Sequence, residues 1–197
     1  MKAWLVLQRA IALSATFLLL PVLVALAATV RFDSPGPALY LANRVGQSGR
    51  PIQIRKLRSM RHEIVQPGPA VTANVDDRVT RVGRWMRERR LDELPQFWDV
   101  ACGRMALVGP RPEDPMFVDL ADPVWIEVLS VLPGITGRAQ LRFHDEGAQL
   151  SGDPHVAYRE RILPDKLAMD LSYVRDRSVR GDLAILADTV RFALGRA

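Results

Sequence analysis

The feature that most constrains this chain is an uncharged run of 21 residues at positions 10–30. Lys2 and Arg9 precede the run, and Arg31 follows it. As a helix, a segment of this length rises about 31 Å, which is roughly the thickness of the hydrocarbon core of a bilayer. Because so apolar a surface needs an apolar partner, the run predicts a helix embedded in a membrane.

Pro21 lies inside this run and alters the expected shape of the helix. Its ring removes one backbone donor and clashes with the carbonyl of Phe17, so we expect a bend there. Ser14 and Thr16 offer nearby hydroxyls for the freed backbone groups. A bent helix can enter one leaflet and return. We therefore predict that residues 1–32 form a kinked, re-entrant membrane helix, with Ser14 and Pro21 at the kink.

Two other interpretations of the N-terminus stay open. The first is a straight helix that spans the bilayer. The second is a cleaved signal peptide, because Ala-Leu-Ala at residues 25–27 resembles a small-residue cleavage site behind a basic start. The run is long for a signal peptide, however, and the basic residues on both sides do not indicate which end of the helix lies in the cytoplasm.

The remaining residues, 33–197, are enough for one domain with a proper core and are hard to divide into two. We expect a mainly helical α+β fold with a small β-hairpin and interfacial amphipathic helices. The formal net charge of +5 indicates an anionic partner, such as a phosphate-rich ligand, nucleic acid or a membrane surface. Cys102 is the only cysteine, which excludes an internal disulfide, and the three histidines lack the spacing of a zinc site.

The segment after a turn-rich linker at 33–37 predicts a β-hairpin over residues 38–60. Two stretches of short apolar alternation flank a turn, GQSGRP, in which Gly46 and Gly49 can take turn conformations. Residues 31–62 hold seven Lys or Arg and a single acid. This excess favours phosphates or anionic headgroups, although a solvated basic face has the same composition.

A surface loop is expected at 64–77, which holds two prolines and no helical period, and a helix is expected to begin near Asp77. Arginines then recur at every third residue and share one helical face. They are Arg78, Arg81, Arg84 and Arg87. Like charges along one face repel unless something negative lies opposite, such as lipid phosphate, a diphosphate ligand or the acids that follow.

The stretch RERRLDELPQFW at 87–98 places Asp92 and Glu93 after three arginines. Because Pro95 suits the first turn of a helix, Asp92 falls where an N-cap belongs. A helix N-terminus also favours bound phosphate, and an ionised carboxylate needs no base to act as a nucleophile. Attack on a phosphate then requires cations, because like charges roughly 4 Å apart repel by about 4 kcal/mol. A capping role and a catalytic role both stay open.

Four blocks of the chain resemble the bacterial sugar transferases, and among them the small monotopic polyprenol-phosphate phosphoglycosyltransferases. They lie at 33–60, 79–112, 131–140 and 167–190, in the order of that family, and include LDELPQ and VGPRP. The resemblance implies transfer of a phosphosugar from a nucleoside diphosphate sugar, usually a UDP-sugar, to undecaprenyl phosphate, with release of UMP. It also implies the first membrane step of a surface-glycan pathway, at the bacterial inner membrane, with the catalytic domain in the cytoplasm.

The resemblance also assigns roles to particular residues. Asp92 is the implied nucleophile, which forms a covalent aspartyl-phosphosugar intermediate, and Glu93 is its supporting acidic partner. Mg²⁺ is the implied cofactor, held by the same two acids, and it would neutralise charge on the diphosphate. The implied phosphate-binding residues are Lys56, Arg58 and Arg87, and the implied nucleotide-binding residues are Pro110, Arg111 and Pro112.

Two other functions stay open. In the first, Asp92 and Glu93 only bind metal, and the transfer has no covalent step. In the second, the chain is a membrane-tethered basic binding protein. Nucleic acid is not the expected partner, because no nucleic-acid motif is recognisable and the two acids would repel its phosphates.

The resemblance does not identify the sugar. After PGITG the chain continues RAQLRFHDEGAQL, which departs from many relatives, while DPHVAYRERILPDK at 153–166 fits a subgroup of the family. The segment from Asp182 carries an apolar stripe at helical spacing, which suits either core packing or seating at the bilayer interface. The stripe consists of Leu183, Leu186, Val190 and Leu194.

Overall fold

The computed structural model describes residues 1–62, 76–150 and 153–195. Most of the loop expected at 64–77 therefore lies outside the described residues. The described part is mainly helical with two small sheets, which confirms the predicted α+β class. Its helices are α1 (Lys2–Asp33), α2 (Arg81–Glu88), α3 (Gln96–Ala101), α4 (Pro123–Val128), α5 (Arg138–Arg142), α6 (Pro154–Ala157), α7 (Leu163–Arg175) and α8 (Val179–Ala193), and its strands are β1 (Leu39–Val45), β2 (Pro51–Leu57), β3 (Ala106–Val108) and β4 (Gly134–Thr136).

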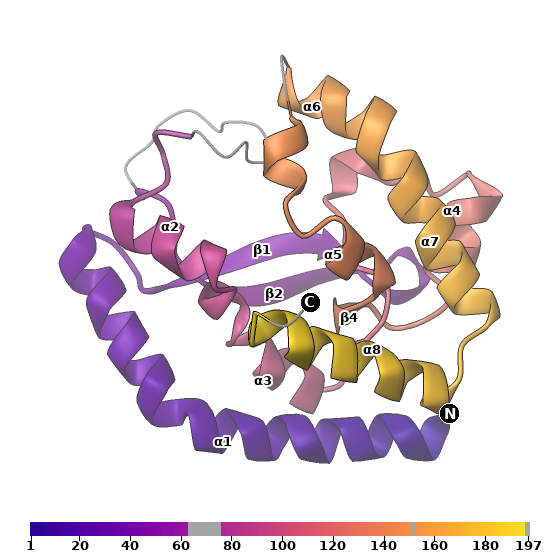
Figure 1. The fold of residues 1–197 in the computed structure, drawn as a ribbon, viewed down its shortest axis with the longest axis horizontal. Helices are drawn as coiled ribbons and strands as arrows, with labels where there is room; N and C mark the ends of the chain where they lie inside the picture. The colour runs from indigo at the N-terminus through magenta and orange to yellow at the C-terminus, as the bar shows by residue number, and fades with distance from the viewer. Residues whose placement is uncertain (63–75, 151–152, 196–197) are drawn as a thin grey trace.

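Helix α1 carries the apolar run and continues through Pro21 without a break. It lies along the lower edge of the molecule, and its axis changes direction partway along before it rises beside α2 (Figure 1). Its buried residues recur at every fourth position near its two ends: Trp4, Gln8, Ala12, Leu26 and Val30. Residues 13–25, between these ends, are exposed or half-buried.

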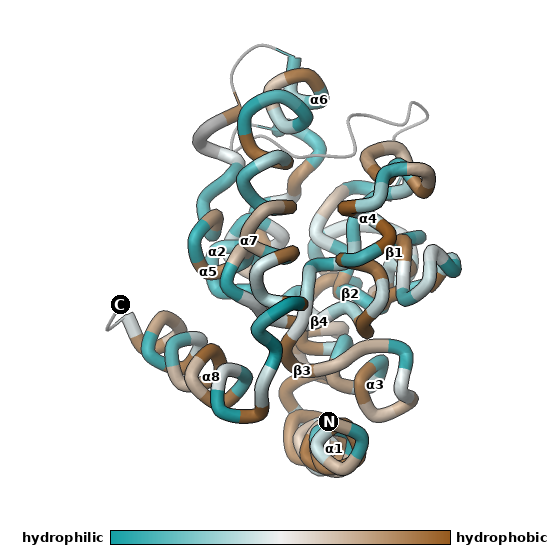
Figure 2. Tube along the Cα trace, turned by 90° about the vertical axis from the view of Figure 1, so that its right-hand side faces the viewer, coloured by the Kyte–Doolittle hydropathy of each residue, from teal (hydrophilic) through white to brown (hydrophobic). Residues whose placement is uncertain are grey.

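The exposed surface of α1 is hydrophobic. Figure 2 looks along part of the helix and shows its mostly hydrophobic residues at the edge of the molecule. By length and composition α1 could cross a membrane. Ser14 and Pro21, the predicted kink residues, are both exposed. Thr16 donates its hydroxyl to the carbonyl of Ala12 at 2.8 Å, so it does not serve the carbonyl that faces the proline ring.

Buried polar contacts fix the first turns of α1 to the domain. Trp4 Nε1 donates to Asp182 Oδ2 at 2.7 Å, and the hydroxyl of Tyr173 donates to Asp182 Oδ1 at 2.7 Å. Gln8 Oε1 accepts from the backbone nitrogen of Leu107 at 2.8 Å. Because burial of a carboxylate is costly without hydrogen bonds, the contacts of Asp182 hold α1, α7 and α8 in one arrangement.

The predicted hairpin is confirmed. Strands β1 and β2 pair in antiparallel fashion, with Ala42 opposite Ile54, and both of these side chains lie in the main core. The turn between the strands contains two residues with positive φ, Ser48 at 57° and Gly49 at 73°. This hairpin lies at the centre of the molecule, between α2 on one side and α4 and α7 on the other (Figure 1).

The second sheet was not predicted. Strands β3 and β4 pair in parallel, with Ala106 opposite Gly134 and Val108 opposite Thr136. A Cβ on Gly134 would lie 2.1 Å from the backbone nitrogen of Gly109, so this close approach of two backbones requires glycine. The chain that follows β3 therefore leaves the core from a fixed position.

Helix α2 begins later than predicted. The expected start was near Asp77, but the first helical residue is Arg81. Thr80 is the N-cap, and its hydroxyl accepts from the backbone nitrogen of Gly83 at 2.9 Å. Asp76 pairs with Arg78 at 2.6 Å, and the residues just before α2 form a separate turn that is not part of the helix.

Core packing is the wrong interpretation for most of the α8 stripe. Leu183, Val190 and Leu194 are exposed, and Leu186 is half-buried. Asp182 is fully buried instead, and two side chains donate hydrogen bonds that compensate for the burial of its carboxylate. These contacts set the rotation of α8 about its axis and leave the apolar stripe facing outward.

Candidate active site

A cavity of about 610 Å³ opens beside the hairpin. The segments that line it come from both strands, from residues 58–62, from the end of α2, and from residues 90–93, 111–114 and 140–146, together with Tyr158 and Lys166. Among the residues that the structure describes, nine Lys or Arg and five Asp or Glu line the cavity. This excess of positive charge suits an anionic ligand.

Asp92 reaches the cavity because the chain turns sharply between α2 and α3. Arg90 has a left-handed conformation, with φ 53°, and Leu91–Glu93 form a single 3₁₀ turn. Arg90 also donates to the carbonyl of Gln140 at 3.2 Å, which ties the turn to α5. The N-cap prediction for Asp92 is wrong, because Pro95 holds the N-cap position of α3 and the carboxylate lies in the preceding turn.

The carboxylate of Asp92 is buried but unpaired. The residue is 8% exposed, lines the cavity and accepts no hydrogen bond from the described part of the chain. Burial raises its pKa above the ordinary 3.8, and the charge of Glu93 raises it further. Lys56, Arg87 and Arg111 act in the opposite direction. The side chain is therefore a basic carboxylate surrounded by cations.

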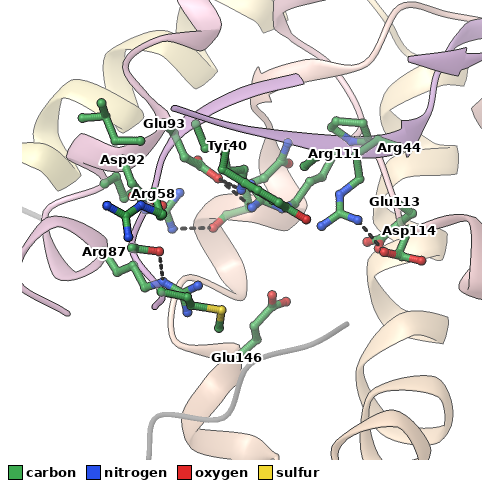
Figure 3. Close-up of a pocket in the computed structure, with 18 of the residues that line it drawn as sticks. Tyr40, Arg44, Arg58, Arg87, Asp92, Glu93, Arg111, Glu113, Asp114 and Glu146 are labelled. Carbon is green, nitrogen blue, oxygen red and sulfur yellow. Dashed lines mark hydrogen bonds and ion pairs between the residues drawn. The ribbon is translucent and has the colours of Figure 1, made fainter. Parts of the chain in front are cut away.

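Glu93 is held by two of these cations. Its Oε1 accepts from Lys56 Nζ at 2.8 Å and from Arg111 Nη2 at 2.7 Å. Burial alone would raise the pKa of Glu93, but Arg111 and Lys56 outweigh burial and hold this pKa well below the ordinary 4.5. The two neighbouring acids thus differ, since Glu93 is ionised and fixed while Asp92 is free to meet a ligand (Figure 3).

The three predicted phosphate-binding residues all line the cavity but make different contacts. Lys56 pairs with Glu93, and Arg87 donates through Nε to the hydroxyl of Ser59 at 2.8 Å. Arg58 is buried, and its guanidinium donates to backbone carbonyls between residues 30 and 37. These contacts give Arg58 a structural role, because a guanidinium whose N–H groups already donate to carbonyls has few donors left for a phosphate.

The predicted nucleotide-binding residues follow β3. Pro110 is buried and does not line the cavity, and its carbonyl accepts from the backbone nitrogen of Gly134 at 2.8 Å. Arg111 and Pro112 do line the cavity. The pairing of β3 with β4 therefore places Arg111 where it meets Glu93.

A second polar cluster lines the same cavity and was not predicted. Lys166 Nζ lies 2.9 Å from Glu146 Oε2, 2.8 Å from the hydroxyl of Tyr158 and 3.3 Å from Glu113 Oε1. The hydroxyl of Tyr158 donates to Glu113 Oε1 at 2.5 Å. Glu146 lies in the stretch after PGITG that departs from many relatives, and Tyr158 and Lys166 lie in the stretch that fits a subgroup of the family. Glu113 directly follows VGPRP, and no local signal in the sequence singled it out.

The donor set limits how a metal ion could bind. Within residues 1–62, 76–150 and 153–195, no three or more His, Cys, Asp or Glu are grouped to hold one. Asp92 and Glu93 adjoin each other, and one oxygen of Glu93 already has two cationic partners. Mg²⁺ is usually held by one or two carboxylates together with substrate phosphates. The two acids therefore fit Mg²⁺ only together with a bound diphosphate.

The chain is similar to proteins of known activity. A model of the family described as bacterial sugar transferase matches residues 3–196. UDP-N-acetylgalactosamine-undecaprenyl-phosphate N-acetylgalactosaminephosphotransferase of Aeromonas hydrophila is 39% identical over 88% of this chain and 39% of that protein. UDP-glucose:undecaprenyl-phosphate glucose-1-phosphate transferase of Caulobacter vibrioides is 38% identical over 89% of this chain and 63% of that protein.

A third relative is similar in length. Exopolysaccharide production protein PSS of Rhizobium leguminosarum bv. phaseoli is 36% identical over 98% of this chain and 97% of that protein. The chain therefore spans less than two thirds of the first two relatives and nearly all of the third. Because the family model and these similarities extend over almost all of its residues, this chain belongs to the bacterial sugar transferase family.

Proposed function

We propose that this chain transfers a sugar 1-phosphate from a UDP-sugar to undecaprenyl phosphate and releases UMP. The observation that carries the proposal is the carboxylate of Asp92, which is buried, lines a basic cavity and accepts no hydrogen bond from any described residue. Two relatives are named as transferases of this kind that act with undecaprenyl phosphate. The product would be a sugar linked to the lipid by a diphosphate. Its formation would be the first membrane step in the synthesis of a surface glycan.

The reaction consists of two displacements at one phosphorus atom. A carboxylate oxygen of Asp92 attacks the phosphorus that bears the sugar, and the bond from that phosphorus to the bridging oxygen breaks. UMP leaves with the electron pair of that bond, and the phosphosugar stays on Asp92 as an acyl phosphate. A phosphate oxygen of the lipid then attacks the same phosphorus and releases the carboxylate of Asp92.

The cations around Asp92 make this attack feasible. A carboxylate and a phosphate roughly 4 Å apart repel by about 4 kcal/mol at an effective dielectric near 20. Lys56 and Arg111 together carry two positive charges, and Glu93 neutralises only one of them. The remaining positive charge, together with Arg87, is available to offset the repulsion. Glu93 serves as a positioning residue, because it holds both cations beside the nucleophile.

Asp92 and Glu93 would hold Mg²⁺ together with oxygens of the donor diphosphate. When bound, this ion would supply neutralisation of the charge that develops on the departing phosphate.

We further propose that α1 is a re-entrant membrane helix and that the domain faces the cytoplasm. The exposed apolar surface of residues 13–25 and the exposed stripe on α8 support seating in one leaflet. We expect Pro21→Ala to straighten α1 and to change which introduced cysteines a membrane-impermeant reagent labels. An unchanged labelling map would contradict the re-entrant topology.

The decisive test of the function is Asp92→Asn in membranes. Without its nucleophile, exchange of labelled UMP into a UDP-sugar in the absence of lipid should fall by at least about a thousandfold. Wild-type protein held with a UDP-sugar should gain the mass of one phosphosugar, and the variant should not. Association with membranes should stay unchanged, because α1 is intact.

Two controls make this test specific. Asp188→Asn removes a carboxylate that pairs with Arg191 on the exposed face of α8, and it should exchange at the wild-type rate. Turnover of the wild type without any trapped mass would favour the alternative in which the acids only hold metal. Wild-type exchange in Asp92→Asn would refute the assignment.

A further inference from the structure

The second polar cluster of the cavity has no role in the chemistry proposed above. Lys166 lies at its centre, is 3% exposed, and contacts Glu113, Glu146 and Tyr158. These contacts use Oε1 of Glu113 and Oε2 of Glu146. The other oxygen of each carboxylate accepts no hydrogen bond from the described residues and is not among the fully buried unpaired atoms. Two acceptor oxygens are therefore open to the cavity.

The cluster and Asp92 share one cavity but lie apart within it. In Figure 3, Asp92 and Arg87 lie on one side, Glu113 lies on the other, and the carboxylate of Glu146 points toward the space between them. Asp92 is more than nine-tenths buried, lines the same cavity, and has no hydrogen-bond partner within the described ranges. A ligand whose diphosphate meets the cations beside Asp92 therefore extends toward the two open acceptors.

The charge of the cluster determines what can occupy this end of the cavity. Two carboxylates and one ammonium leave a net charge of −1. Burial would raise the pKa of Glu113, but Lys166 and the hydroxyl of Tyr158 lower it below the ordinary 4.5. Open carboxylate oxygens accept hydrogen bonds and repel other anions. They therefore suit a group that is rich in hydroxyl donors and carries no negative charge.

A UDP-sugar offers two candidates for this position, the donor sugar and the uridine. A neutral pyranose presents several hydroxyl donors, whereas uridine presents two ribose hydroxyls and a uracil with one N–H donor beside two carbonyl oxygens that carboxylates disfavour. The positive end of the cavity, with Lys56, Arg87 and Arg111, is the place for the phosphates. The sugar is thus the better match for the acceptor pair.

We infer that Glu113 and Glu146, held by Lys166 and Tyr158, bind the hydroxyls of the donor sugar and select neutral sugars over sugars that carry a carboxylate. This inference rests on the proposed function, because it assumes a UDP-sugar in the cavity. A uronate carboxylate about 5 Å from either glutamate would meet a repulsion that corresponds to a discrimination on the order of a hundredfold.

Donor selection by the wild type is the first test. UMP release with undecaprenyl phosphate is measured for UDP-glucose, UDP-galactose, UDP-N-acetylgalactosamine, UDP-glucuronate and UDP-galacturonate. We expect kcat/KM for the best neutral donor to exceed that for either uronate about a hundredfold. Equal use of neutral and uronate donors would overturn the inference and leave the proposed function standing. Release of UMP from none of the five would overturn both.

Glu146→Gln is the second test, because it removes the charge of the more exposed glutamate and keeps its size. We expect kcat/KM for the neutral donor to fall about tenfold, since an amide is the weaker acceptor, and the preference over uronates to shrink at least tenfold. Inhibition by UMP should stay unchanged, because UMP lacks the donor sugar. An equal loss of UMP affinity would place the nucleoside at the cluster and refute the inference.

Two further variants serve as controls for this test. Glu127→Gln changes a glutamate that pairs with Arg175 at the surface, and it should leave donor preference and UMP inhibition as in the wild type. Glu113→Gln repeats the test with the other open acceptor, in case Glu146→Gln does not fold. If both cavity variants fold and neither changes the preference for neutral donors, the cluster does not select the sugar.

Discussion

Replacement of Glu93 by glutamine should separate the two acids of the site. The change keeps the shape of the side chain and removes the charge that binds Lys56 and Arg111 at 2.8 and 2.7 Å. Loss of one partner from a buried ion pair typically costs 3–5 kcal/mol. Because glutamine still offers an oxygen and Arg111 is partly solvated, we expect the free energy of unfolding to fall by about 3 kcal/mol.

The same change should alter the pH dependence of UMP exchange in a defined direction. Burial is the main cause of the raised pKa of Asp92, and the charge of Glu93 is the second. In the proposed reaction, exchange requires ionised Asp92, so the rate of exchange falls as the pH falls through this pKa. Without the charge of Glu93 the pKa of Asp92 decreases, and the acid limb of the profile should move to lower pH.

The rate itself should fall while the acid limb moves. Lys56 and Arg111 lose the carboxylate that positions them, and misplacement of catalytic groups by about 1 Å can cost a hundredfold. We therefore expect exchange at the optimum to be lower by about a hundredfold, with Glu127→Gln unchanged as the control. An acid limb that stays in place or moves to higher pH would refute the electrostatic coupling of the two acids.

Two further substitutions test the framework that carries the site. Asp182→Asn leaves one amide oxygen for two buried donors, Trp4 and Tyr173, so the free energy of unfolding in detergent should fall by about 2–4 kcal/mol. The exposed control Asp188→Asn should change this free energy by less than about 0.5 kcal/mol. Equal effects of the two substitutions would contradict the bridging role of Asp182. Gly134→Ala would place a Cβ 2.1 Å from a backbone nitrogen, so stability should fall by about 2–3 kcal/mol and UMP exchange with it; wild-type values of both would show that β3 and β4 adapt.

Local sequence patterns were sufficient for the elements whose signal is local. The uncharged run at 10–30 predicts a long apolar helix, because no charged residue interrupts it, and α1 has this character. The hairpin of β1 and β2 follows from apolar alternation around a glycine-containing turn. In both cases the physical cause lies within a short stretch of chain.

The elements that the sequence did not predict depend on contacts between distant residues. Strands β3 and β4 are only three residues long and pair because Gly134 allows the two backbones to touch. The outward stripe of α8 follows from the burial of Asp182 against α1, more than 170 residues away along the chain. Periodicity within one helix cannot show which face a distant partner will cover.

The candidate site shows the same division. LDELPQ identified Asp92 and Glu93. Only the structure shows that Glu93 is held by two cations while Asp92 accepts no hydrogen bond in the part of the chain that it describes. Glu113 and Lys166 are 53 positions apart in the sequence and meet only in the folded chain. Side chains without a local motif become visible as a site only when the cavity brings them together.

Arg58 connects the apolar helix α1 to the candidate site. Its guanidinium donates to the carbonyls of Val30 and Ser34, at the C-terminal end of α1, and Arg58 directly follows β2, the strand that carries Lys56. A planar group with five donors fixes several carbonyls at once, which the point charge of a lysine cannot do. Trp4 fixes the other end of α1 to α8. Because both ends of the apolar helix are fixed to the domain, its exposed middle keeps a constant position relative to the basic cavity. The proposed transfer from a soluble donor to a lipid acceptor at one carboxylate requires such an arrangement.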